Sequence, residues 1–197
     1  MKVLCLSKTL SNETLCYNKE KNICIETYKN NELKISMPLH SATHIDFPLH
    51  VNNIKSLNNY TISDFIFTKP YVREINLKDD YFELNALENI PKEIDLLIIK
   101  TNNHFGGINE KCAKYIKENF LNIKAIGVDC ISLNAYLNKE EGKKAHRELL
   151  STEKEILIIE DMDLNMVNEG FLNKVIVAPL MVQNADGTPV TVIAEVE

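Results

Sequence analysis

Three histidines and one aspartate crowd into a stretch of eleven residues, His40-Ser41-Ala42-Thr43-His44-Ile45-Asp46-Phe47-Pro48-Leu49-His50. The whole chain of 197 residues holds only five histidines, so chance does not account for this cluster. Neutral imidazole and carboxylate groups together suit zinc, manganese or iron, whereas a mixed N/O set argues against calcium or magnesium alone. The stretch therefore predicts a metal site, and the fold must allow these side chains to converge.

The spacing H-x3-H-x-D-x3-H favours a bent, extended segment over a helix. In a helix, His40 and His44 would share a face, but Asp46 would point away and Pro48 would break the helix. There is also no Glu next to His44 that could act as the general base of a zincin site. In an extended segment the even-numbered positions share one side, although a straight strand would separate His40 from His44 by about 13 Å. We therefore expect a bend at residues 41–43, which are small.

The stretch resembles the signature H-x-G-T-H-x-D-x-P-x-H of the metal-dependent cyclase/arylformamidase family, which includes bacterial kynurenine formamidases and isatin hydrolases. It departs from that signature at Ala42, where the family usually has Gly. If the family has Gly there because the backbone φ is positive, alanine destabilises the fold by about 1 kcal/mol or more. If Gly is there only to let another group approach closely, alanine is tolerated. By resemblance, the metal ligands of this segment are His40, His44 and Asp46. His50 is then the general acid/base.

Two downstream segments complete the ligand set that the resemblance implies. Residues 145–150 resemble the family's H-x-x-L-L region, and residues 156–161 resemble its apolar strand ending in Glu. The added ligands are therefore His146 and Glu160. Glu160 also stands out by itself, because a carboxylate at the end of an apolar strand must be paired, protonated or metal-bound when buried. For His146 the alternative is a surface helix position beside three basic residues.

Further positions bear on the pocket and on the resemblance. Tyr17 stands where the family carries an aromatic-Pro-Gly-Asp segment, so it either supplies an aromatic pocket wall or is a partly exposed strand residue. The Pro-Gly turn is missing and the chain has no Trp. Asp129 matches the family's G-[IV]-D-x-x-S segment, where we expect structural hydrogen bonding, and residues 178–189 resemble its A-P-L…D-G-[ST]-P ending. His104 either lines the pocket mouth or lies solvated in a loop.

The distribution of apolar residues predicts a strand-rich α/β fold. Expected strands cover residues 2–7, 22–28, 33–37, 69–77, 95–101, 125–132, 156–161, 174–182 and 188–196. Short helices are expected at 61–65 and 84–90, and an amphipathic helix at 109–121. The run 95–101 is continuously apolar, as in a strand buried on both faces. With no repeat or linker, residues 1–197 form one domain, and the resemblance implies a swivelling β/β/α architecture with mixed sheets.

Composition excludes several classes of function. The net charge is −6 and no basic patch stands out, so nucleic acid is not expected as a partner. No run of about 18 apolar residues predicts a membrane span. Five cysteines without a C-x-x-C pair, and no signal peptide at the start, favour a reduced, cytoplasmic protein.

Together these features predict a metal-dependent hydrolase of an amide bond in a small molecule, either a formamide or a cyclic amide. The expected cofactor is a divalent metal, zinc before manganese, as one or two ions. Cyclase or dehydratase chemistry at the same site, and metal binding without turnover, are the alternatives. Family members commonly form at least dimers with shared pocket walls, so the resemblance implies a homo-oligomer, a dimer or a tetramer.

Overall fold

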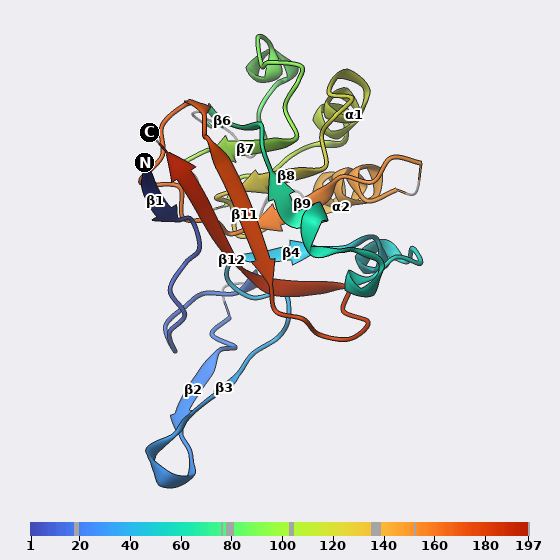
Figure 1. Ribbon diagram of the computed structural model, residues 1–197. Helices are drawn as coiled ribbons and strands as arrows, with labels where there is room; N and C mark the ends of the chain where they lie inside the picture. The colour runs from blue at the N-terminus through green and yellow to red at the C-terminus, as the bar shows by residue number, and fades with distance from the viewer. Residues whose placement is uncertain are drawn as a thin grey trace.

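Strands from distant parts of the chain form one long, curled sheet with helices on one face (Figure 1). The computed structural model describes residues 1–17, 20–75, 77, 81–102, 105–134, 139–151 and 153–196. Four neighbouring strands run parallel, namely β6 (Pro70–Glu74), β7 (Leu96–Lys100), β8 (Ala125–Val128) and β9 (Leu157–Glu160). The strand β4 (His44–Asp46) pairs antiparallel with β9 and links this half of the sheet to the other.

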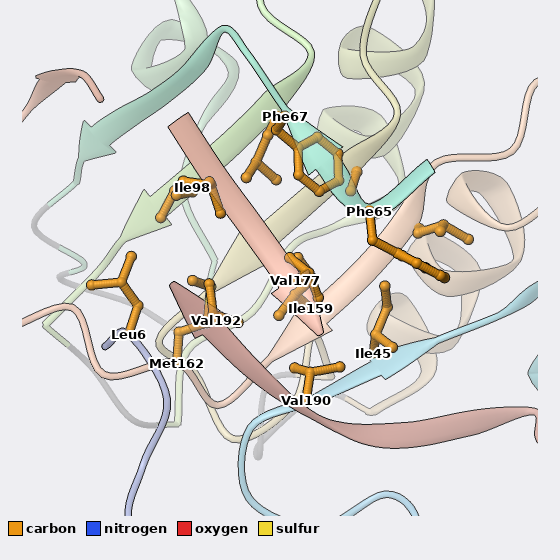
Figure 2. Close-up of a cluster of buried hydrophobic side chains, with 14 of the residues drawn as sticks. Leu6, Ile45, Phe65, Phe67, Ile98, Ile159, Met162, Val177, Val190 and Val192 are labelled. Carbon is orange, nitrogen blue, oxygen red and sulfur yellow. The ribbon is translucent and has the colours of Figure 1, made fainter. Parts of the chain in front are cut away.

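The second half of the sheet folds back over the first. It contains β12 (Gly187–Val196), β11 (Lys174–Pro179), β5 (Ile66–Phe67) and β1 (Lys2–Cys5), while β10 (Gly170–Phe171) borders β6. One apolar core lies between the halves, where Ile98 and Ile159 of the parallel strands meet Val177 and Val192 (Figure 2). Burial of this apolar surface stabilises the curl.

A second core lies on the opposite face of the parallel strands, under the helices α1 (Glu110–Asn119) and α2 (Lys139–Leu149) (Figure 1). Successive residues of β7 alternate between the cores, because Ile98 faces the other half of the sheet and Leu97 and Ile99 face the helices. All five residues of β7 are buried, which confirms the prediction for 95–101. The β/β/α layering of the expected α/β fold is likewise confirmed.

The strands expected at 22–28 and 33–37 form a hairpin that projects from the body of the molecule (Figure 1). It consists of β2 (Cys24–Thr27) and β3 (Leu33–Ser36), which pair only with each other among the described residues. Asn30 and Asn31 in its turn have φ values of +59° and +62°, a left-handed conformation that Asn tolerates better than most residues. After β3 the chain returns to the body and enters the stretch that begins at His40.

Several element boundaries differ from the predictions for local reasons. No helix was predicted between residues 47 and 60, where the structure has 3-10 helices at Pro48–Val51 and Leu57–Asn59. The short helices expected at 61–65 and 84–90 are present as 3-10 helices, at Ile62–Phe65 with Thr61 as its N-cap and at Leu84–Leu87. The strands β4, β5 and β10 were not predicted, since they are two or three residues long and form through pairing alone. None of the helices in the described ranges is long and apolar enough to cross a bilayer.

Candidate metal centre

The strand β4 brings two predicted ligands to the centre of the sheet. His44 lies directly opposite Glu160 in the register of β4 with β9, and Asp46 follows two residues later on the same face. Nε2 of His44 is consequently 3.4 Å from Oε2 of Glu160 and 3.5 Å from Oδ1 of Asp46. All three residues are buried. Strand pairing therefore joins residues that are more than a hundred positions apart in the chain.

His146 reaches the same point from α2. Its Nε2 atom lies 3.0 Å from Oε1 of Glu160 and 3.6 Å from Oδ2 of Asp46. The residue is 4% exposed, so the alternative of a surface position is wrong. Gly142, one turn earlier, allows α2 to pack closely against Asn134, because a Cβ atom at position 142 would overlap that residue.

His40 enters the site through the predicted bend, which the structure confirms. Ala42 has a φ of +52°, in the left-handed region, and the chain reverses direction so that Nδ1 of His40 lies 2.8 Å from Oδ1 of Asp46. The imidazole of His40 occupies the space beside Gly187, the residue opposite Asp46 in β12. A Cβ atom at Gly187 would overlap this ring, so the glycine makes room for it.

Thr43 fixes the bend to the end of β9. Its hydroxyl donates to the carbonyl oxygen of Asp161 at 2.7 Å and accepts from the backbone N–H of Lys8 at 2.9 Å. Lys8 also forms an ion pair with the buried Asp161 carboxylate. Because Asp161 directly follows Glu160 and Thr43 directly precedes His44, this network holds the two ligands in register.

Backbone carbonyls determine how the two buried imidazoles present their nitrogens. Nδ1 of His44 lies 2.7 Å from the carbonyl oxygen of Ala42, and Nδ1 of His146 lies 3.0 Å from that of Gly142. A carbonyl can only accept, so each Nδ1 carries the hydrogen and each Nε2 faces the carboxylates. This arrangement is typical of histidines that bind a metal through Nε2.

The electrostatic balance of the cluster is that of a cation site. Burial lowers the pKa of His44, but the carboxylates of Asp46 and Glu160 outweigh it and raise that pKa to about 9. The same opposition of burial and carboxylates raises the pKa of His146 to about 10. Burial and the neighbouring Asp46 raise the pKa of Glu160, yet His146 and His44 bring it down to about 2. Positive charge at this point is therefore strongly favoured.

The donor set fits a divalent transition metal. Ligand atoms of His44, Asp46 and Glu160 lie within 4.8 Å of one another, and so do those of His40, Asp46 and His50. Oδ2 of Asp46 is buried and lacks a hydrogen-bond partner among the described residues, as expected for an oxygen that faces an ion. Nitrogen and oxygen ligands of this kind suit zinc and manganese. Asp46 belongs to both groups.

His50 lies at the rim of the site, in the 3-10 turn that begins at Pro48. Its ring centroid is 4.3 Å from that of His40 and 5.9 Å from that of His146. Sequence reasoning missed its neighbour Asp186, whose Oδ2 lies 3.4 Å from Nδ1 of His50 and 3.2 Å from Nε2 of His40. The D-G-[ST]-P pattern was the available signal, but no site residue was assigned from it. The pairing of β12 with β4 is what carries Asp186 to the site.

The predicted site residues line a pocket of about 150 Å³, namely His40, His44, Asp46, His50, His146 and Glu160. Its remaining walls are Tyr17, Ile131, Ser132 and Asn134. Tyr17 thus lies where an aromatic wall was expected, with Nζ of Lys139 5.1 Å from its ring centroid. Ser132 and the backbone N–H of Leu133 donate to Oε1 of Glu160, at 3.3 and 2.6 Å. His104 lies outside the described residues.

A larger hollow of about 420 Å³ lies near the ends of β7, β8 and β9 but contains none of the clustered histidines. Its wall residue Asp129 accepts hydrogen bonds from the backbone N–H groups of Thr101 and Asn102, at 3.0 and 2.9 Å. This is the structural hydrogen bonding expected of Asp129. The chemistry of the ligand set therefore favours the smaller pocket as the functional site.

Comparison with known sequences places these features in a wider context. Residues 4–135 match the family described as "Putative cyclase". A kynurenine formamidase of Bacillus cereus (strain ATCC 10987 / NRS 248) is 30% identical over 169 residues, which cover 80% of this chain and 76% of the relative. A kynurenine formamidase of Bacillus anthracis matches with the same identity and coverage.

Solved structures share the fold. A potential metal-dependent hydrolase with cyclase activity superimposes with a TM-score of 0.83 at 22% identity, covering 98% of this chain and 96% of the other. Isatin hydrolase A from Labrenzia aggregata, bound to benzyl benzoate, gives a TM-score of 0.80 at 17% identity, with 99% and 93% covered. The architecture is thus common to all three chains.

Proposed function

This chain belongs to the cyclase family, and from that premise we propose that it is a metal-dependent hydrolase of a non-peptide amide bond, in a formamide or a cyclic amide. The observation that carries the proposal is the convergence of His44, Asp46, His146 and Glu160 from three separate elements onto one buried point. The kynurenine formamidase and isatin hydrolase relatives support the choice of bond.

The proposed metal ligands are His40, His44, Asp46, His146 and Glu160. Zinc is the first choice of metal and manganese the second, as one ion or as two bridged by the carboxylates. When bound, the ion supplies an acidified water and polarises the carbonyl of the substrate. The polypeptide contributes a fixed geometry, because Ser132 and Leu133 hold Glu160 and two backbone carbonyls hold the histidine rings.

His50 is the proposed general acid/base. It stands at the rim, where it can reach both a bound substrate and solvent, and it would protonate the departing amine. Asp186 accepts a hydrogen bond from Nδ1–H of His50. The other ring nitrogen, Nε2, is then the atom proposed to exchange a proton with the substrate. Tyr17 is the proposed aromatic wall against the substrate.

We also propose that the protein acts as a homodimer in the cytoplasm. Leu33 and Ile35 lie on one face of the projecting hairpin and are 76% and 47% exposed. A two-stranded hairpin is marginally stable alone, so a second copy of the chain is the proposed cover for this apolar face. All five cysteines are free, which suits a reducing compartment.

The test begins with metal analysis of protein purified without chelator. The loaded protein is then assayed against formamides, cyclic amides and esters, and the products are identified. We expect stoichiometric zinc or manganese and release of formate or of a ring-opened acid. Full metal occupancy with no hydrolysis across the panel would indicate a metal-binding protein without turnover, and a newly closed ring would indicate cyclase chemistry.

A further inference from the structure

A second hollow, which we call the annex, opens beside the metal pocket. It also has a volume of about 150 Å³, and it shares the walls His50, Asn134 and His146 with that pocket. Its own walls include Lys143 and Arg147 of α2. A substrate held at the metal pocket can therefore extend into the annex past His50.

Two positive charges border the annex, and both are available to a ligand. Lys143 and Arg147 are four residues apart on a helix, so their side chains lie on the same face. The Nζ atom of Lys143 pairs with Glu140 at 2.7 Å, but both side chains are largely exposed, and such a pair is readily exchanged for another. Within the part of the chain that the structure describes, the guanidinium of Arg147 has no hydrogen bond or salt bridge.

The neighbouring Lys144 provides a matched comparison for Lys143 on the same helix. Lys144 pairs with Glu141 at 2.6 Å and does not line the annex. It has the same side-chain exposure as Lys143, 50% in each case. Position on the helix, rather than charge or exposure, therefore distinguishes the two lysines.

We propose that the annex binds a carboxylate carried by the amine part of the substrate, an inference that rests on the proposed hydrolysis. His50 lines both hollows and is the group proposed to protonate the departing amine, so the amine part lies next to the annex. The planar fork of Arg147 matches a carboxylate in two parallel hydrogen bonds, and Lys143 adds a second positive charge. The substrate class is then an N-acyl, chiefly N-formyl, derivative of an amino acid or aminobenzoate.

The first test compares two substrates that differ only in charge. Formate release from 2-formamidobenzoate and from its neutral analogue 2-formamidobenzamide is measured with the metal-loaded wild type, Arg147→Gln, Lys143→Gln and the control Lys144→Gln. Arg147→Gln should raise KM for the benzoate about tenfold and change KM for the benzamide less than about twofold. Lys143→Gln should act in the same direction more weakly, and Lys144→Gln should change neither. If Arg147→Gln changed KM for the benzoate and for the benzamide by the same factor, or changed neither, the proposal would be overturned.

The second test does not depend on catalysis. Metal-free wild type, in which no hydrolysis is expected, is titrated with 2-formamidobenzoate, and the backbone amide signals of α2 are followed by NMR. Saturable shifts around His146 and Arg147 that weaken about tenfold in Arg147→Gln and persist in Lys144→Gln support the annex even if the loaded protein proves inactive. Absence of binding to the wild type counts against the annex, whereas inactivity with intact binding counts only against the proposed function.

Discussion

The Nε2 atom of His146 lies 3.0 Å from the Oε1 atom of Glu160, although the first residue belongs to a helix and the second to the end of a buried strand. The contact is made possible by the packing of α2 against the sheet, which buries both residues. It connects the downstream half of the ligand set to His44 and Asp46, and the proposed chemistry depends on it. The predictions that follow test this cluster and the features that support it.

Removal of His44 should abolish metal binding. Its Nε2 atom faces both Asp46 and Glu160, and its ring is held by the carbonyl of Ala42. We expect His44→Ala to fold, as judged by circular dichroism, and to contain no stoichiometric metal by elemental analysis after dialysis. A folded variant that retains one equivalent of metal would show that His44 is not a ligand.

Removal of His50 should leave the metal and lose the reaction. As a general acid/base at the rim, it should contribute about 10²–10⁴-fold to kcat. His50→Ala is therefore expected to keep its metal content while turnover falls by that factor. Metal loss would instead assign His50 as a ligand, since His40, Asp46 and His50 also lie close enough to hold an ion. Asp186→Asn should retain metal and reduce kcat less than His50→Ala does.

Metal binding should release protons at neutral pH. The raised pKa values of His44 and His146, about 9 and about 10, mean that both rings are protonated in the metal-free protein at pH 7. Because a metal binds only the neutral imidazole, loading should release about two protons from these two rings, and His40, whose pKa is also raised, adds to this number. Calorimetric titration in two buffers of different ionisation enthalpy measures this number. A value near zero at pH 7 would contradict the charged state of the cluster.

The same shifts set the pH dependence of stability in the metal-free protein. A histidine whose pKa is higher in the folded than in the unfolded protein stabilises the fold when it is protonated. For His44 and His146 this stabilisation is complete below the ordinary histidine pKa of 6.5 and is lost as the pH rises through about 9 to 10. The free energy of unfolding in urea with a chelator present should therefore decrease between pH 6.5 and pH 10. The metal-loaded protein should show a smaller decrease over this range, because its imidazoles are already neutral.

Ala42→Gly should stabilise the protein. Alanine at a φ of +52° places Cβ against the following carbonyl, a cost of about 1–2 kcal/mol that glycine avoids. The buried methyl group and the larger freedom of glycine in the unfolded chain offset part of this gain. We expect the free energy of unfolding to rise by about 0.5–1 kcal/mol in urea titrations. As a control, Ala185→Gly, at a buried position outside the left-handed region, should destabilise; destabilisation by Ala42→Gly would contradict the strain argument.

The apolar face of the hairpin should control the oligomeric state. Light scattering during gel filtration should show a dimer for the wild type and a monomer for Leu33→Glu combined with Ile35→Glu, since burying two carboxylates at an apolar contact is costly. Lys34 lies on the opposite face of the same strand, so Lys34→Gln should remain dimeric. A monomeric wild type, or a dimer that survives the double substitution, would exclude this interface.

The sequence by itself supplied the candidate ligands and predicted much of the local structure. The spacing of the clustered ligands, with small residues between His40 and His44, predicted the bend, and Pro48 argued against a continuous helix. The apolar run of β7 predicted burial on both faces. These features depend on side-chain chemistry and on neighbours within a few residues, which a sequence displays directly.

Only the tertiary structure decided which residues meet. The register of β4 between β9 and β12 places Glu160 opposite His44 and Gly187 opposite Asp46, and it brings Asp186 to His50. The packing of α2 turns His146 inward and leaves Lys143 and Arg147 at the edge of the annex. Strand register and helix docking are set by the summed burial of many apolar side chains across the sheet, so no short segment encodes them.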